Sequence, residues 1–290
     1  MKAFCTSVLF VWFLSIFIPG CGRNPTPSSG SLGNGCSGIL LSGTMRDSLT
    51  SQPVAQGTAS LETGTELSTT PLYIFSPTQS VATNAKGEFS WCVQAVTYPS
   101  VLVLEATDSS GKSYPPYVQA VTTTTDLGTI PMGGCAVACG LAGEVQTAAP
   151  ATITGVVTST PAAATGTVMP LFSMRALDNS KAADGSENLW ALALPLFPAS
   201  TSLTFSTASG TCGGTAPFCA SYTLSVPAQS PVYPVSGGTM QQAATPIYMI
   251  YVMPNNTAAC SPPFGISTSI LLATPGAQLT AQAAALTNCR

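Results

Sequence analysis

Short runs rich in Thr, Val and Leu follow one another from Cys36 onward, and Gly, Pro and Asn separate them. Few stretches show the 3.6-residue period of a helix, so the pattern predicts strands and turns. The first half contains seven predicted strands: Ile39–Arg46, Ala59–Leu61, Leu72–Phe75, Phe89–Val96, Val101–Ala106, Tyr117–Thr122 and Leu127–Met132. Seven short strands in about a hundred residues are typical of a β-sandwich.

The second half shows the same pattern with fewer clear strands: Ser221–Val226, Ile247–Met253, Ser267–Ala273 and Leu279–Leu286. Both faces of Ile247–Met253 are apolar, which predicts a central strand covered on both sides. The Ala-rich last segment has helix propensity, but the turn residues Pro275 and Gly276 before it favour a strand. The sequence therefore predicts an all-β protein with two β-sandwich domains, residues 36–134 and 140–290.

The N-terminus has the pattern of an export signal. Lys2 is followed by the apolar run Val8–Ile18, which is too short to span a bilayer as a helix. The run ends in Ile18-Pro19-Gly20-Cys21, which resembles the lipobox of bacterial lipoproteins. This resemblance implies a signal peptide over residues 1–20 and diacylglycerol on Cys21. The alternative is an ordinary signal peptide with an incidental cysteine.

Gly, Pro and Ser dominate residues 21–35, which predicts a flexible tether between the lipid and the folded body. The lipid is then the membrane anchor. Gly22 stands where an aspartate usually retains an enteric lipoprotein in the inner membrane. We therefore expect a cell-envelope protein outside the cytoplasm, with the outer membrane or the periplasmic face favoured.

Eight cysteines follow the predicted lipid site, and an even number behind an export signal predicts four disulfides. Cys212 and Cys219 bracket a turn-rich stretch, and Cys260 and Cys289 flank the terminal segment, so each pair is a candidate disulfide. The remaining four allow three pairings: Cys36, Cys92, Cys135 and Cys139. Zinc is the rival interpretation because of the Cys135–Cys139 spacing, but the chain has no Cys-x-x-Cys pair.

Three segments of the first half carry a family resemblance: Leu41–Asp47, Pro53–Leu61 and Ala82–Trp91. They resemble the Gly-Thr-Val-x-Asp strand, the Pro-x-x-Gly-Ala turn and the Thr-Asp-x-x-Gly-x-Phe hairpin of the carboxypeptidase regulatory-like domain. Asp126–Ile130 resembles its last strand. The resemblance covers about residues 36–134 and departs from the family at Asn84 and in the insertion Thr63–Thr70. It implies a transthyretin-like sandwich without catalytic residues, and it predicts fold better than function.

An internal repeat links the two halves. Pro and Gly follow Trp91 at the same spacings as they follow Trp190, and Ile153–Val157 is similar to Leu41–Met45. The matched spacings predict that the second domain is a diverged duplicate of the first. Each Trp is then expected to anchor a core between sheets. The alternative is a Trp-lined sugar platform.

Composition excludes several kinds of chemistry. The 290 residues are 45% hydrophobic and 7% charged, and none is histidine. A Ser-His-Asp triad, a Cys-His pair and a His-ligated metal are therefore absent. Eight basic residues against eleven acidic ones, with no basic run, argue against a nucleic-acid partner.

The acidic residues sit mainly at predicted turns and strand ends, and no feature pairs two of them in the way a glycosidase requires. The densest group is Asp178-Asn179-Ser180 with Asp184–Glu187, which fits a calcium site less well than a polar hairpin tip. We therefore predict no catalytic residue, no metal and no cofactor.

Three functional hypotheses remain. The favoured one is a non-enzymatic envelope lipoprotein with a structural or binding role, whose partner is an envelope protein or a glycan. The second is a carbohydrate- or peptide-binding accessory module of a separate enzyme or transporter. It predicts an exposed aromatic cluster, with four candidates: Tyr114, Tyr117, Tyr222 and Tyr233. The third is a hydrolase that uses carboxylates alone.

Overall fold

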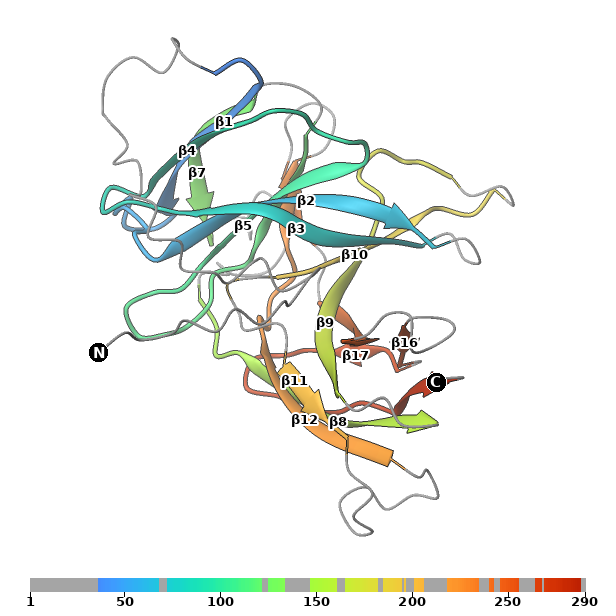
Figure 1. The fold of residues 1–290 in the computed structure, drawn as a ribbon. Helices are drawn as coiled ribbons and strands as arrows, with labels where there is room; N and C mark the ends of the chain where they lie inside the picture. Colours follow the sequence, from blue (N-terminus) through green and yellow to red (C-terminus); the bar gives the residue numbers. More distant parts are fainter. Residues whose placement is uncertain are drawn as a thin grey trace, which may run out of the picture. The chain divides into compact units, whose positions relative to one another are not determined.

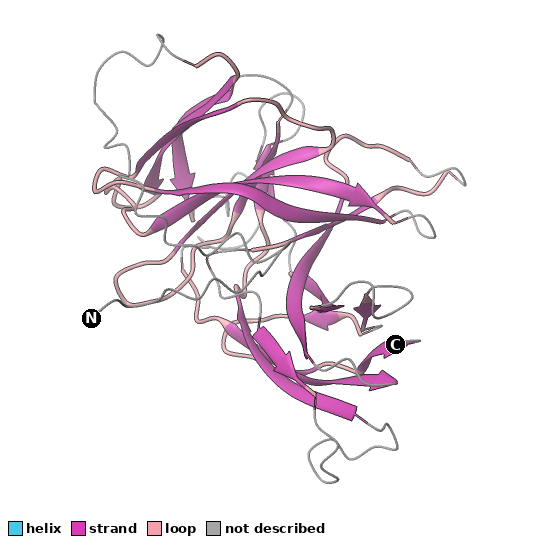
Figure 2. Ribbon diagram, viewed as in Figure 1, coloured by secondary structure: helices cyan, strands magenta, loops and turns pink. Residues whose placement is uncertain are grey.

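The computed structural model describes most of the chain from Cys36 to Thr287. The described ranges are 36–67, 72–121, 125–133, 147–160, 165–181, 185–194, 196, 201–205, 218–234, 240–242, 246–255, 264–267 and 269–287. These residues form strands and the turns between them, and none of them is helical (Figure 2). The predicted all-β class is therefore confirmed.

The first half forms seven strands: β1 (Ile39–Asp47), β2 (Gly57–Glu66), β3 (Leu72–Ala82), β4 (Glu88–Val93), β5 (Ser100–Ala106), β6 (Tyr117–Ala120) and β7 (Thr125–Met132). All seven predicted strands are present. Strands β4, β1 and β7 form one sheet in that order (Figure 1). Strand β1 is antiparallel to β4 and parallel to β7. The other four strands pair in the order β3-β2-β5-β6.

The second half contributes twelve strands: β8 (Ala151–Thr160), β9 (Thr165–Arg175), β10 (Leu189–Leu192), β11 (Thr201–Thr204), β12 (Phe218–Val226), β13 (Val232–Pro234), β14 (Met240–Gln242), β15 (Ile247–Pro254), β16 (Gly265–Ile266), β17 (Leu271–Leu272), β18 (Gln278–Thr280) and β19 (Ala284–Thr287). The predicted strand Ser267–Ala273 is present only as the two-residue strand β17, and β16 ends before it. At Ser267 the amide donates a hydrogen bond to the Ile250 carbonyl and the hydroxyl donates one to the Gln282 carbonyl.

The second half repeats the pairing pattern of the first. Strand β8 is antiparallel to β12 and parallel to β18 and β19, as β1 is to β4 and β7. In the second half, β9 lies between β10 and β15, and β16 and β17 pair with β15. In the first half, β2 lies in the same way between β3 and β5, and β6 pairs with β5. This correspondence supports a diverged duplicate. It also matches the similarity between Ile153–Val157 and Leu41–Met45, which lie on the equivalent strands β8 and β1.

The strands β6-β5-β2-β3 of the first half and β10-β9-β15-β16 of the second form two half-sheets, which join edge to edge. Strand β10 is parallel to β3, with Leu189 opposite Leu72 and Leu192 opposite Phe75. The strand order reverses across this junction while the two junction strands keep one direction. Equivalent faces of the half-sheets therefore point to opposite sides of the continuous sheet. The boundary predicted between residues 134 and 140 lies outside the described residues.

Each half-sheet has a core on a different face. The first core packs β2 and β5 against β1, β4 and β7 and contains residues such as Leu41, Met45, Phe89, Leu102 and Ile130. The second core packs β9, β10 and β15 against β8 and β12 and contains residues such as Ile153, Val157, Trp190, Tyr248 and Leu224. It also contains Phe75, Val101 and Val103 from the first half, so residues of both halves share it.

The repeated tryptophans do not occupy equivalent places. Trp190 lies on β10 and is buried against Phe75, with ring centroids 4.8 Å apart, so its predicted anchoring role is confirmed. Trp91 lies on β4 and is only half-buried at the edge of the first core. Because β10 corresponds to β3 and not to β4, the equal spacings around the two residues do not mark equivalent positions. The tryptophan spacings therefore do not support the duplication, whereas the strand pairing does.

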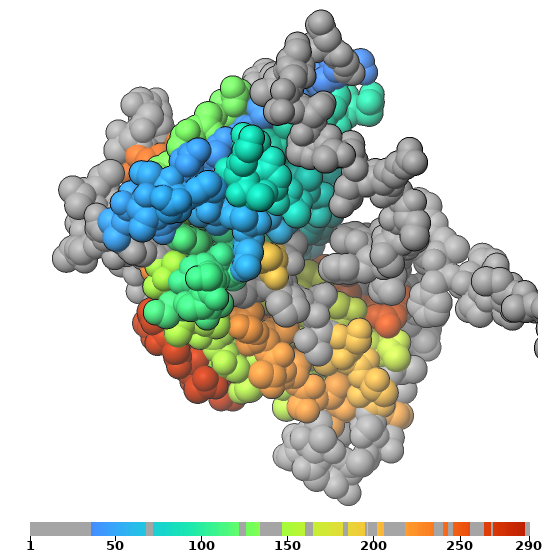
Figure 3. Space-filling model, turned by 90° about the vertical axis from the view of Figure 1, so that its left-hand side faces the viewer, coloured from blue at the N-terminus to red at the C-terminus, as the bar shows by residue number. Residues whose placement is uncertain are grey.

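The outer face of the β12-β8-β18 sheet is a neutral, hydroxyl-rich surface. In Figure 3 the segments near residues 280, 155 and 222, coloured red, yellow-green and orange, lie side by side in the order given by the strand pairing. A shallow open groove there is lined by Thr154, Gly155, Val156, Ser221, Tyr222, Thr223 and Thr280. The groove offers hydroxyl groups and backbone but no carboxylate or amine.

Gly155 is required by the tyrosine opposite it on β12. A Cβ at Gly155 falls 2.3 Å from the Tyr222 hydroxyl oxygen and 2.5 Å from its ring. We expect Gly155→Ala to lower the free energy of unfolding by about 1–3 kcal/mol, because the buried ring has to move. Chemical denaturation measures this loss. The double variant Gly155→Ala/Tyr222→Phe is expected to lose less than the sum of the single variants; strictly additive losses would contradict the contact.

Candidate binding site

One aromatic side chain stands out from the surface. Tyr98 is 66% exposed, and it is the one exposed large aromatic residue in the described part of the chain. It lies in the connection between β4 and β5, directly before Pro99. The Pro99 carbonyl accepts a hydrogen bond of 2.8 Å from the Gly64 amide of β2. The connection is therefore fixed to the sheet immediately beside the exposed ring.

The Tyr98 hydroxyl is held by a carboxylate from the other half of the chain. It donates a hydrogen bond to Asp178, which lies in the connection between β9 and β10. Asp178 also accepts a hydrogen bond of 3.0 Å from the Ser180 amide, which fixes its orientation. The hydrogen bond to Asp178, then burial and the negative charge of Asp178, raise the pKa of Tyr98 to about 12.

A second tyrosine and a second carboxylate lie in the same region. Tyr73 of β3 hydrogen-bonds Glu66, which is the last residue of β2. Burial, followed by the negative charges of Glu66 and Asp178, raises the pKa of Tyr73. We refer to Tyr98, Tyr73, Glu66 and Asp178 as the tyrosine–carboxylate cluster. Its members come from both halves of the chain.

The cluster is suited to binding rather than to acid–base chemistry. Burial of Asp178 acts to raise its pKa, but hydrogen bonds from Tyr98 and Ser180 outweigh it and the pKa is lowered. The pKa values of both tyrosines are raised. These three groups therefore do not exchange protons near neutral pH, as a general acid or base would. An exposed ring beside carboxylate acceptors can instead hold a ligand that has an apolar face and hydroxyl groups.

Two carboxyl groups lie where solvent does not reach them. Glu62 of β2 and Glu105 of β5 are at most 1% exposed. One oxygen of Glu105 accepts a 2.8 Å hydrogen bond from the Leu196 amide. The other oxygen of Glu105, both oxygens of Glu62 and the hydroxyl of Ser60 have no hydrogen-bond partner of normal geometry. Both acids lie on the sheet face that carries Val101 and Val103 of the second core.

Burial governs the protonation of this acid pair. It raises the pKa of Glu105 to about 8, although the Leu196 amide acts to lower it. Burial, followed by the charge of Glu105, raises the pKa of Glu62 well above its usual range, against a smaller effect of the Ala193 amide. Both acids are therefore mainly protonated at neutral pH. Their burial removes them from contact with any substrate in solvent.

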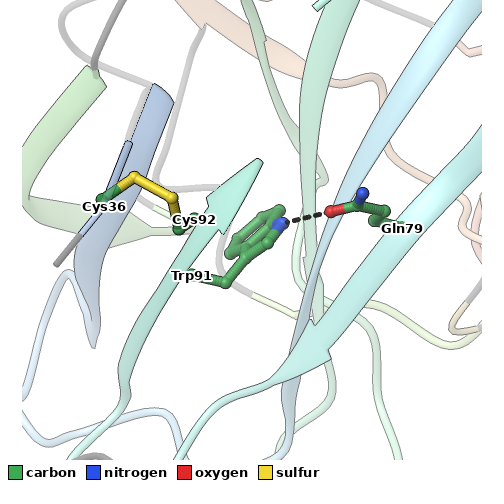
Figure 4. The surroundings of a disulfide bond; sticks show 4 residues. All are labelled: Cys36, Gln79, Trp91 and Cys92. Atoms are coloured by element: carbon green, nitrogen blue, oxygen red, sulfur yellow. Dashed lines mark hydrogen bonds between the residues drawn. A yellow bond between two sulfur atoms is a disulfide. The ribbon is translucent and has the colours of Figure 1, made fainter. Parts of the chain in front are cut away.

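One disulfide forms within the group of four cysteines whose pairing the sequence left open. Cys36 and Cys92 form a disulfide, with their Cα atoms 5.5 Å apart. Figure 4 shows it beside Trp91, whose indole N–H donates a 3.2 Å hydrogen bond to Gln79. The bond connects the residue where the predicted tether ends to strand β4. It selects one of the three pairings left open by the sequence.

Of the other predicted disulfide cysteines, one lies among the described residues. Cys219 is buried on β12 and is disulfide-bonded. The remaining five, together with the lipid site, lie outside the described residues: Cys21, Cys135, Cys139, Cys212, Cys260 and Cys289. Their roles stay predictions. The described residues contain no group of three or more acidic or cysteine side chains that could hold a metal ion.

The predicted exposed aromatic cluster is wrong. Tyr114, Tyr117 and Tyr222 are buried, and Tyr233 is half-buried, because each lies on or beside a strand that packs into a core. Tyr98 was missed, although one indicator was available: it stands directly before a proline in the short connection between two predicted strands. Asp178 lies in the connection predicted as a polar tip, whereas Asp184 of the same group lies outside the described residues.

Comparisons with known proteins assign no family. No protein-family model and no curated protein matches the chain. Among solved structures, a proposed adhesin from Bacteroides thetaiotaomicron is 11% identical over 73% of this chain and 75% of that one, with a TM-score of 0.23. The shaft pilin SpaA from Lactobacillus rhamnosus GG is 9% identical over 86% and 97%, with a TM-score of 0.22. These values are too low to assign function.

Among the described residues, there is no helix that could span a membrane.

The buried acids predict that stability falls as the pH rises. Above about pH 4.5 the unfolded chain releases the protons of Glu62 and Glu105, while the folded chain keeps them. The free energy of unfolding is therefore expected to fall by up to about 1.4 kcal/mol per pH unit for each acid. For Glu105 this fall continues until its folded pKa of about 8. Denaturation midpoints between pH 5 and 8 measure it.

The control compares buried and exposed acids. Glu62→Gln/Glu105→Gln is expected to flatten this pH dependence, because amides do not titrate. Glu88→Gln, in the exposed turn with Asn84, is expected to leave it as in the wild-type protein. Equal slopes in all three proteins would contradict the assigned role of the buried pair.

Proposed function

We propose that this chain is a non-enzymatic, lipid-anchored protein of the cell envelope that works by binding through its β-sandwich modules. The observation that carries the proposal is the placement of its carboxyl groups. Glu62 and Glu105 are buried, and Asp178 is held in hydrogen bonds with a lowered pKa. None of these three carboxyl groups is therefore both exposed and poised to act as a general acid or base near neutral pH.

The start of the folded body supports the anchoring part of the proposal. Cys36 follows the tether predicted over residues 21–35 and is bonded to Cys92. A disulfide is expected in a protein that has left the cytoplasm. Together with the lipobox resemblance at Ile18–Cys21, it fits a body held at a membrane surface by a lipid on Cys21.

The family resemblance of the first half belongs to the same proposal. The resembling segments fall on β1, on β2 and the approach to it, and on the turn that connects β3 to β4. In that turn, Gly87 has a positive φ of 76°, and the Asn84 side chain accepts hydrogen bonds from the Lys86 and Glu88 amides. Asn84 thus fills the turn role that the family's aspartate has. We infer that residues 36–134 are a carboxypeptidase regulatory-like module.

A specific observation favours a glycan as the partner. In the tyrosine–carboxylate cluster, the Tyr98 ring is exposed and its hydroxyl is fixed by Asp178. A fixed ring loses little conformational entropy when a ligand stacks on it. A neutral sugar has the required apolar ring face and hydroxyl donors. The cluster therefore supports the second candidate function, a carbohydrate-binding module of the envelope.

The anchor is tested by the intact mass of the protein extracted from its own membranes with detergent, without reduction. We expect a chain that begins at Cys21, carries lipid and lacks eight thiol hydrogens. Cys21→Ala is expected to abolish the lipid mass and the membrane association. Cys5→Ala, in the signal peptide, is the matched control and is expected to change neither. An unlipidated wild-type chain with free thiols would overturn the proposal.

The glycan candidate is tested on a glycan array followed by titration of the best neutral oligosaccharide. We expect Tyr98→Ala to weaken binding at least 10-fold, because the stacking surface is lost. Tyr98→Phe keeps the ring but loses its hydrogen bond to Asp178, so an intermediate loss is expected. Leu49→Ala, at an exposed site, is expected to bind normally. A flat array for the wild-type protein rejects the glycan and leaves the anchor intact.

A further inference from the structure

Three of the exposed large apolar side chains lie close together at one edge of the second half-sheet. Ile270 is 74% exposed, Leu272 is 51% exposed and Ile247 is 38% exposed. Ile247 and Leu272 are directly opposite each other in the pairing of β15 with β17. Directly opposite residues project from the same face of a sheet. Their side chains therefore form a continuous surface, and the exposed Ile270 lies two residues before Leu272 in the chain.

The same face continues into an apolar cluster along β15. Because successive side chains of a strand alternate, Met249, Tyr251 and Met253 share the face of Ile247. Met249 and Met253 are half-buried and pack against a cluster built around Leu171 and Tyr251. Methionine side chains adapt to the shape of a partner. We define the apolar patch as Ile247, Met249, Ile270 and Leu272.

The segment of the chain that forms the patch carries no charge. The sequence contains no Asp, Glu, Lys or Arg from Asn188 to Cys289, and this segment includes every residue of the patch. A charged residue of the same face, Arg175 on β9, is paired with Glu187 at 2.9 Å. An apolar centre depleted in charge and rich in Met and aliphatic residues has the composition of a protein–protein interface core.

We propose that two copies of this chain associate through the apolar patch. A neutral face is complementary to itself, because neither copy buries an unpaired charge of the other. A bilayer surface fits less well, since interfacial membrane binding relies on Trp, Lys and Arg around the apolar residues, and the patch has none. Association also removes from water the side chains of Ile270 and Leu272, which gives it a hydrophobic driving force.

The association extends the proposed function without depending on it. If the chain is anchored by lipid, neighbouring copies share one membrane surface, which raises their effective concentration. A modest intrinsic affinity then suffices for pairing in the envelope. If the anchor is absent, the patch and the uncharged segment that forms it are unchanged, and the association is measured in the same way.

The test is sedimentation equilibrium of the full-length protein, extracted in a density-matched detergent, over a hundredfold range of concentration. We expect a monomer–dimer equilibrium for the wild-type protein. Leu272→Glu is expected to raise the dimer dissociation constant at least 10-fold. The matched control is Leu49→Glu, since Leu49 is also 51% exposed but lies in the turn after β1, and it is expected to dimerise normally. Circular dichroism checks that both variants are folded.

Two further measurements keep the proposal open to contradiction. Ile270→Glu introduces a charge at the most exposed position of the patch, so it is expected to weaken the dimer even if Leu272→Glu fails to fold. Flotation of Cys21→Ala protein with phosphatidylcholine vesicles tests the membrane alternative. A wild-type monomer at all concentrations, equal weakening by Leu49→Glu, or vesicle binding that Leu272→Glu abolishes would overturn the proposal.

Discussion

The structure depends on the parallel pairing of β3 with β10. This contact joins two half-sheets that have the same strand order into one continuous sheet. Because the order reverses there, the three-stranded sheet β4-β1-β7 covers one face of the continuous sheet, and the four-stranded sheet around β8 covers the opposite face. The junction also aligns Phe75 with Trp190 and lets Val101 and Val103 of the first half enter the second core. The duplication therefore yields a protein whose halves share hydrophobic stabilisation.

The same arrangement explains the buried acids. Strand β5 is buried over its whole length, because it has one core on each face. Its residue Glu105 and the neighbouring Glu62 of β2 therefore lie inside the protein, in a chain that has few charged residues. Burial of a carboxyl costs least when the group is protonated. The two acids between the cores are thus mainly neutral at pH 7.

Much of the fold was predictable from the sequence, since strands and turns are specified by local patterns. The seven strands of the first half and the turn at Asn84 are local in this sense. The position of Glu62 was not predictable, because the covering face comes from residues more than a hundred positions away. Likewise, the exposed Tyr98 and its partner Asp178 are far apart in sequence, and alternating patterns do not reveal which tyrosines are covered. The Trp91 and Trp190 spacings misled because β10 is equivalent to β3, not β4.

The Cys36–Cys92 disulfide has a mechanical consequence. Strand β1 pairs with β4 so that Leu40 lies opposite Cys92, and the disulfide closes this end of the pair. A force that pulls on the N-terminus enters the folded body at Cys36 and passes through the covalent bond into β4 as well as β1. Strand β1 therefore cannot be pulled away from β4 at this end while the disulfide is intact. A body attached through its N-terminus resists peeling at the point where the load enters.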